Sequence, residues 1–369
     1  MNEHTYFRPV SGRMLQQSIL KHVRRRPDGV EEGAAIGNDA AIFLNKGIKS
    51  VQTTGSAVTE RFPEGASVTA AEAAWITAEN QLATADAVPG VVQVLLTMGS
   101  GCPEERIRKE MQILTRLSAE RKCPIVGGNT TTFGDGDDCL IQLVMTGVLE
   151  EAARADSGSG EAADEGSAGG NVGGNVGGNA GKELPARRRP APTDVVYFLG
   201  ETGCLGAELL AAGRKEALAE HFSESYLREM RYPAEAFSIV AAAGAARRAG
   251  AVFLHDVSNG GVYAALYQLA EAADGGILVQ HEGLTIRQSV IELCECLGIN
   301  PYLLYGTGGL LAVVPEEQAE AWEAEMSRTD HRFRRAAVIT KEKARMVQAE
   351  SFPMRRALNL PEGDAFEEA

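Results

Sequence analysis

A low-complexity segment from residue 151 to residue 192 divides the chain and limits what it can fold into. It reads EAARADSGSGEAADEGSAGGNVGGNVGGNAGKELPARRRPAP, with GGNV repeated and almost no large apolar side chain. Such a stretch cannot bury enough surface to offset the entropy lost on ordering. We therefore expect a disordered linker or a surface insertion. A glycine-rich phosphate cradle fits poorly, because a cradle needs a strand directly before it and a helix directly after it.

Alternating strand and helix patterns lie on both sides of this segment. Before it, residues 103–122 have the apolar spacing of a helix, and residues 139–149 resemble a strand. After it, strand-like runs such as DVVYFLG and AVFLHD alternate with helical runs such as GGVYAALYQLAEAADGG. The alternation predicts an α/β (α+β) protein with two domains, at residues 1–150 and 193–345, and a tail at residues 346–369.

Composition excludes several classes of partner. The formal charge of the 369 residues is -14, and the only basic blocks are the short clusters Arg24–Arg26 and Arg187–Arg189. A nucleic-acid partner is not expected, because it needs a basic face. No apolar run reaches 18 residues, and the N-terminal residues lack the apolar core of a signal peptide, so no membrane partner is expected. Six cysteines without a CxxC pair favour a reducing, cytoplasmic location.

Four short polar stretches follow or separate the apolar runs. They are GNDAA at 37–41, ENQLA at 79–83, GGNTT at 127–131 and HDVSNGG at 255–261. Glycines allow a backbone to approach a ligand closely, and amide groups at a helix N-terminus attract an anion. Carboxylate and amide oxygens suit a hard cation such as magnesium. Taken singly, each stretch is also ordinary turn chemistry.

The order of the four stretches resembles the AIR synthase-like (PurM-like) superfamily, and the second half of the chain resembles its hydrogenase-maturation HypE members. The stretches that carry the resemblance are HDVSNGGVYAALYQLAEAADGGILV, LGINPYLLYGTGGLLAVVP and GETGCLGAELLA. The resemblance implies a two-domain fold that binds ATP or a related phosphate compound through magnesium between the domains. It also implies a homodimer in which the first domains pair their strands.

Transferred position by position, the resemblance gives a set of candidate ligand-binding residues: Asn38, Asp39, Thr53, Thr54, Asn80, Gln81, Gly127, Gly128, Asn129, Thr130, Asp256, Gly260 and Gly261. Four carboxylates of the family pattern are replaced, three by the amides of Asn38, Gln81 and Asn129, and one by Gly55. Asp39 and Asp256 remain as candidate metal ligands.

The replacements leave three interpretations open. Magnesium prefers charged oxygens, whereas an amide offers a neutral oxygen and two donors. The site is therefore rewired to contact a phosphorylated ligand directly, or it is a weakened magnesium–ATP site, or the chain is a non-catalytic regulatory or assembly subunit. HypE proteins carry a C-terminal cysteine that accepts a carbamoyl group. No cysteine follows Cys296 here, so that chemistry is not expected in the same form. His255 is interpreted as a structural hydrogen-bonding group, with a general base as the alternative.

Overall fold

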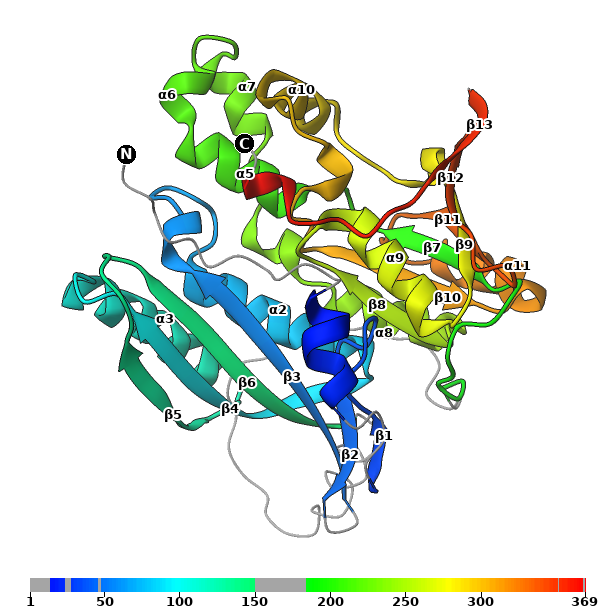
Figure 1. The fold of residues 1–369 in the computed structure, drawn as a ribbon, viewed down its shortest axis with the longest axis horizontal. Helices are drawn as coiled ribbons and strands as arrows, with labels where there is room; N and C mark the ends of the chain where they lie inside the picture. Colours follow the sequence, from blue (N-terminus) through cyan, green and yellow to red (C-terminus); the bar gives the residue numbers. More distant parts are fainter. Residues whose placement is uncertain (1–13, 24–27, 46–47, 150–183, 351, 368) are drawn as a thin grey trace, which may run out of the picture.

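A computed structural model describes residues 14–23, 28–45, 48–149, 184–350, 352–367 and 369. These residues form two sheets with helices packed on them (Figure 1). Most of the low-complexity segment lies outside the described residues, and residues 184–192 continue from it without regular structure. No described helix combines the length and the apolar character that crossing a membrane requires.

The first sheet has six strands in the order β1-β2-β3-β6-β4-β5, antiparallel except for the parallel β4–β5 pair. The strands are β1 (Val30–Glu32), β2 (Ala41–Asn45), β3 (Ile48–Val58), β4 (Ala87–Met98), β5 (Ile125–Thr132) and β6 (Cys139–Leu149). Short helical turns occur at Leu15–Ile19, Leu20–His22 and Thr59–Arg61. One face is covered by α2 (Ala70–Thr84), against which α3 (Glu104–Glu120) packs.

Helix α2 lies unusually close to strand β3. The helix starts at a capping box in which Thr69 and Glu72 satisfy each other's backbone N–H groups, and its first half is rich in alanine. A Cβ at Gly55 in β3 would lie 1.9 Å from the carbonyl oxygen of Ala74. Gly55 is therefore required by the close packing of α2 on the sheet.

The second sheet has seven strands in the order β13-β12-β9-β11-β7-β10-β8, antiparallel except for the parallel β12–β9 pair. The strands are β7 (Val195–Leu199), β8 (Phe253–Val257), β9 (Gly276–Gln280), β10 (Gly309–Val314), β11 (Phe333–Thr340), β12 (Arg345–Ala349) and β13 (Phe352–Ala357). Residues 346–369 are thus not a simple tail, because they supply β12 and β13.

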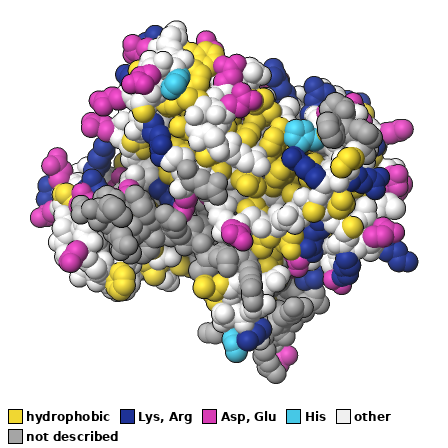
Figure 2. Space-filling view, turned by 45° about the horizontal axis from the view of Figure 1, so that its top comes forward, with side chains coloured by type: hydrophobic (Ala, Val, Ile, Leu, Met, Phe, Trp, Pro, Cys, Tyr) yellow, Lys and Arg dark blue, Asp and Glu magenta, His cyan; other side chains and the backbone are white. Residues whose placement is uncertain are grey.

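Helices cover both faces of the second sheet. Helix α9 (Gly261–Ala272) packs on one face, and α8 (Val240–Ala249) and α11 (Ala319–Met326) pack on the other. A further layer contains α5 (Cys204–Gly213), α6 (Lys215–Leu218), α7 (Glu224–Glu229) and α10 (Gln288–Leu297). Short turns lie at Ala234–Phe237, His281–Gly283, Pro301–Leu303, Glu316–Gln318 and Ala365–Glu367. On the face shown in Figure 2, apolar side chains gather in a central band with charged side chains around it.

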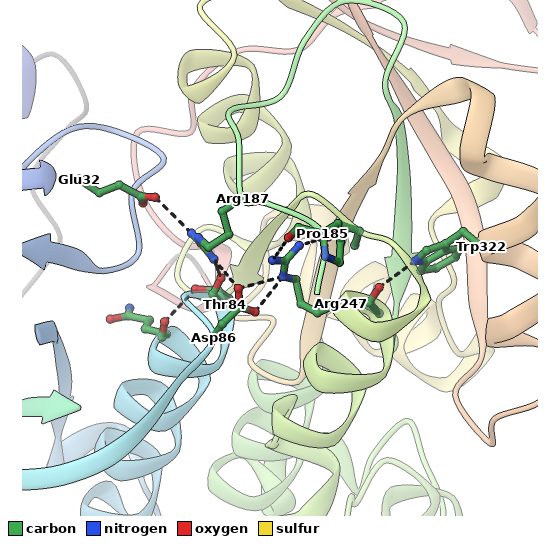
Figure 3. Close-up of polar contacts among 10 residues, drawn as sticks. Glu32, Thr84, Asp86, Pro185, Arg187, Arg247 and Trp322 are labelled. Carbon is green, nitrogen blue, oxygen red and sulfur yellow. Dashed lines mark hydrogen bonds and ion pairs between the residues drawn. The ribbon is translucent and has the colours of Figure 1, made fainter. Parts of the chain in front are cut away.

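The two sheets are joined through α2, which contacts both β8 and α8. At its C-terminal end, a group that we call the Asp86 clamp consists of Asp86, Arg187 and Arg247 (Figure 3). The Nε of Arg247 lies 2.8 Å and 2.9 Å from the two carboxylate oxygens of Asp86, and its Nη2 donates to the Pro185 carbonyl at 2.7 Å. Arg187 donates to the Thr84 carbonyl. The clamp therefore fixes α2 to α8 and to the segment that enters the second domain.

Candidate functional site

A second contact between the domains contains the titratable residues of the candidate site. Asp39, just before β2, lies against His255 and Asp256 in β8, and we call these three residues the Asp39 cluster. The Oδ1 of Asp39 is 2.5 Å from the Nδ1 of His255, and its Oδ2 accepts the backbone N–H of Asp256 at 3.0 Å. One potential ligand atom from each residue lies within 4.8 Å of the others.

The local sequence explains how the cluster is held. Strand β8, FLHDV, is buried along its whole length, so both His255 and Asp256 are withdrawn from solvent. The Nε2 of His255 lies 3.0 Å from the Oε1 of Gln268 on α9. The turn before Asp39 contains Gly37 at a φ of +82°, where a Cβ would meet the Gln268 carbonyl at 2.3 Å. Glycine thus allows the first-domain turn to rest directly on α9.

The charges in the cluster raise the pKa values of two of its members. Burial alone would lower the pKa of His255, but the charge of Asp39 and the hydrogen bond to it raise that pKa to about 9. Burial and the nearby Asp39 charge raise the pKa of Asp256 to about 8. Both shifts favour the protonated forms, so at neutral pH the imidazole carries a charge and the negative charge shared by the two carboxyl groups is reduced.

A magnesium ion does not fit this arrangement. Each oxygen of Asp39 already faces a protein group, and both ring nitrogens of His255 are occupied, one by Asp39 and the other by Gln268. Magnesium requires near-octahedral oxygen coordination and favours carboxylates. Asp39 and Asp256 therefore lie side by side, as the sequence pattern predicts. Their negative charge is offset by His255 and not by a metal ion.

The amide side chains near the cluster bind backbone groups. Asn38 donates to the Gly33 carbonyl at 2.8 Å. Asn80 is buried; it donates to the Phe237 carbonyl at 2.9 Å and accepts the N–H of Ile239 at 3.0 Å. In the orientation that satisfies its amide, Gln81 donates to the backbone carbonyls of Asp39 at 3.2 Å and Thr54 at 3.0 Å.

Two of the four expected loops are regular structure instead. The ENQLA stretch forms part of the last turns of α2, because the helix continues through it to Thr84. The GGNTT stretch lies inside β5, where Gly127, Gly128, Asn129 and Thr130 are exposed on the edge strand. Strands β4 and β6 separate β5 from β3, a span of three strand spacings or about 14 Å. Within one chain, Gly127–Thr130 do not join the Asp39 cluster.

The remaining predicted residues divide between the two domains. Thr53 is buried and donates to the Ala78 carbonyl at 3.1 Å, whereas Thr54 is exposed. Gly260 and Gly261 lie at the start of α9 with φ of +77° and +66°. The N–H of Gly260 already donates to Asp364 at 2.7 Å. A cavity of about 450 Å³ lies elsewhere, between residues 59–69 and the start of α3, and contains none of the predicted residues.

The contacts of His255 with Asp39 and Gln268 fit the structural hydrogen-bonding role that the sequence predicts for it. The sequence does not predict its partner Gln268, nor Asp364 at the start of α9. Gln268 and Asp364 carried no local signal. In the sequence, Gln268 is a single polar residue in a helical pattern. Asp364 comes near α9 only because the chain folds back after β13.

Comparison with known proteins identifies the family. The model of the AIR synthase related protein N-terminal domain matches residues 37–149, and that of its C-terminal domain matches residues 191–348. The chain belongs to the AIR synthase-related family. The family and the two-domain fold expected from the sequence are thereby confirmed.

Curated relatives include two HypE proteins. The chain is 34% identical over 146 residues to carbamoyl dehydratase HypE of Rhodobacter capsulatus, which covers 40% of each protein. It is 26% identical over 288 residues to carbamoyl dehydratase HypE of Rhizobium leguminosarum bv. viciae, covering 77% of this chain and 71% of the relative.

Solved structures agree on the fold. Escherichia coli HypE superposes with a TM-score of 0.64 at 17% identity, covering 92% of this chain and 95% of that one. A HypE structure in complex with ATP gives a TM-score of 0.58 at 18% identity, covering 95% of both chains. At these identities the likeness describes the fold alone.

Proposed function

We propose that this protein binds a nucleotide or a related phosphorylated metabolite between its two domains, beside the Asp39 cluster and the start of α9. One observation carries the proposal. The carboxylate of Asp39, from the first domain, accepts the N–H of Asp256 near the end of β8, two residues before the turn that leads into α9. The family supports the ligand class, because one HypE neighbour was solved with ATP and a thiamine monophosphate kinase neighbour with AMPPCP.

In this proposal the site is rewired, with protein donors replacing a metal ion. His255 offsets the negative charge of Asp39 beside the ligand, and backbone N–H groups at the start of α9 favour an anion. Two positions beside the cluster that are acidic in the family pattern hold Asn38 and Gln81 here. Fewer fixed negative charges reduce the repulsion of a phosphate, so binding is expected without magnesium.

A thermal-shift screen of nucleotides and phosphorylated metabolites, followed by calorimetry of the best ligand, tests this proposal. We expect His255→Gln to weaken binding about tenfold, equivalent to about 1.4 kcal/mol, because the site loses a buried cation. The matched control is His331→Gln, a histidine in the loop before β11, which should leave the affinity unchanged. The proposal fails if no phosphorylated ligand binds the wild type, or if the two variants behave alike.

A non-catalytic regulatory or assembly role is the second candidate. Every residue of the Asp39 cluster already contacts another protein group, which favours this second role. A HypE neighbour has also been solved in a complex with HypF. An assay of ATP turnover across a metal titration separates the two. Turnover above the background rate would identify an enzyme, whereas ligand binding without turnover at any metal concentration would identify a regulatory or assembly subunit.

We further propose that the protein is a cytoplasmic homodimer built on the first sheet. Strand β5 is exposed at the edge, with Val126 56% and Phe133, just beyond it, 71% exposed. On β6 the buried residues alternate with partly exposed apolar residues such as Leu140 and Val144. Among the described residues, an edge strand without a further partner and a sheet face with partly exposed apolar residues favour association with another chain. Light scattering that gives the mass of a monomer at micromolar concentration would overturn this proposal.

A further inference from the structure

The segment of residues 358–367 places a buried carboxylate at the start of α9. The Oδ2 of Asp364 accepts the N–H of Gly260 at 2.7 Å, and its Oδ1 accepts the N–H groups of Tyr305 at 3.0 Å and Phe366 at 2.9 Å. Asp364 is 1% exposed. Gly260 is the residue that precedes the first turn of α9, where the helix dipole favours a negative charge.

The backbone around Gly261 leaves no room for a side chain. A Cβ at Gly261 would lie 2.5 Å from the Tyr302 carbonyl and 2.8 Å from the Leu304 carbonyl. The chain therefore turns tightly there, and the N–H of Gly260 takes its partner from outside α9, the carboxylate of Asp364. The carboxylate of Asp364 thus contacts the backbone at the glycine pair that the sequence predicts to lie close to a ligand.

The same segment crosses from the second domain to the first. In Figure 1 it runs in red from β13 past α9 and ends beside α5. Glu367 forms an ion pair with Arg61 of the first domain, and Arg214 at the end of α5 donates to the Ala369 carbonyl. Ala365 is 1% exposed, and Phe366 packs against a cluster that contains Val68 of the first domain. We call the described part of this segment, residues 358–367, the strap.

We propose that the strap is a built-in competitor, whose Asp364 carboxylate occupies the anion position at the start of α9 and must leave before a phosphate group can bind there. This inference rests on the proposed function and adds a mode of regulation to it. When the competent state is only a fraction of the molecules, the apparent affinity falls by that fraction. A strap displaced in one molecule of ten therefore weakens binding about tenfold.

The electrostatics of Asp364 support a contact that can open. Burial raises the pKa of Asp364 to about 6, even though three backbone N–H groups and the charge of Arg61 act to lower it. The free-energy cost of removing the charged carboxylate from water is thus larger than the stabilisation that its hydrogen-bond partners and Arg61 provide. A phosphate carries more charge and more acceptor oxygens than a carboxylate, so it competes well for the same donors.

Asp364→Asn tests the proposal, with ATP as the probe and calorimetry as the measurement. Asparagine keeps the shape but turns an amide N–H group toward backbone donors, which weakens the hold of the strap. We expect ATP affinity about tenfold higher than in the wild type. Glu362→Gln is the matched control, because Glu362 lies exposed in the same segment and its affinity should equal that of the wild type.

The outcomes separate this inference from the proposed function. Equal ATP affinity in wild type and Asp364→Asn overturns the strap and leaves nucleotide binding intact. Absence of binding in both overturns nucleotide binding and, with it, the competition. Hydrogen exchange in the wild type gives an independent reading that needs no variant. Saturating ATP should speed exchange at the N–H of Phe366, and unchanged or slower exchange there would contradict displacement.

Discussion

The Asp86 clamp and the Asp39 cluster join the same two domains in chemically different ways. In the clamp, one carboxylate faces two guanidinium groups, and Arg247 is 2% exposed. Arginine does not lose its proton in proteins, so this contact keeps one charge state. In the cluster, two carboxyl groups lie beside one imidazole whose pKa is raised to about 9. The clamp fixes the relative position of the domains. The cluster, by contrast, can gain or lose a proton, and a bound ligand can replace one of its protein contacts.

Loss of Arg247 should have the largest effect on stability. In Arg247→Ala, Asp86 and the carbonyl oxygens of Pro185 and Ala251 lose a buried partner. We expect the free energy of unfolding to fall by about 3–5 kcal/mol, measured by urea denaturation. Arg248→Ala, at the exposed neighbouring position, should cost less than about 0.5 kcal/mol. Equal losses in the two variants would show that the clamp does not hold the domains.

Loss of His255 should cost less, because glutamine retains a hydrogen-bonding side chain. His255→Gln leaves Asp39 and Asp256 together without a cation, and we expect a loss of about 2–3 kcal/mol at neutral pH. His331→Gln serves again as the control and should be nearly neutral. If His255→Gln destabilised the protein more than Arg247→Ala, the division into a fixed clamp and an adaptable cluster would be wrong.

The wild type should lose stability as the pH rises from about 6.5 to about 9. A histidine whose pKa is about 6.5 when unfolded and about 9 when folded stabilises the folded state at low pH, and that contribution disappears over this range. Asp256, with a folded pKa of about 8, acts in the same direction, because the folded state binds the extra proton. Urea denaturation at several pH values should show a shallower decline for Asp256→Asn. A rise in wild-type stability over this range would contradict the protonation states.

Restoring one acid should have the smallest effect. Asn38→Asp loses the hydrogen bond to the Gly33 carbonyl, at a cost of about 1 kcal/mol, and places a second carboxylate beside Asp39. Added magnesium should then raise the melting temperature of the variant by about 2 °C and leave the wild type unchanged. The same magnesium response in the wild type would mean that the existing residues already bind the ion. Gly55→Asp cannot test this point, because Ala74 fills the space.

The sequence predicted the site best where one short stretch contains the whole arrangement. Strand β8, its polar turn and α9 were recognised because HDVSNGGVYAALYQLAEAADGG carries the strand end, the glycines and the helical spacing in order. Asn80 and Gln81 were assigned to a loop because polar residues there resemble a turn. Tertiary packing decides otherwise, since Asn80 is buried against the backbone of Phe237 and Ile239.

Other features depend on contacts between distant parts of the chain. Gly55 stands where the family pattern has an acid, and only the approach of α2 shows that the glycine is a steric requirement. Asp364 lies 104 residues from Gly260, and no periodicity links them. Strands β12 and β13 lie where the sequence predicts a tail, because β12 joins the sheet by pairing with the distant strand β9 and β13 pairs only with β12.

Calorimetry of ATP binding to the wild type, with magnesium and then with a chelator, tests the central claim most directly. If His255 and backbone donors replace the metal ion, the two dissociation constants should agree within about threefold, or less than about 1 kcal/mol. Binding that is at least about tenfold tighter with magnesium would contradict the account, because the residues around Asp39 and Asp256 would then hold a cation after all.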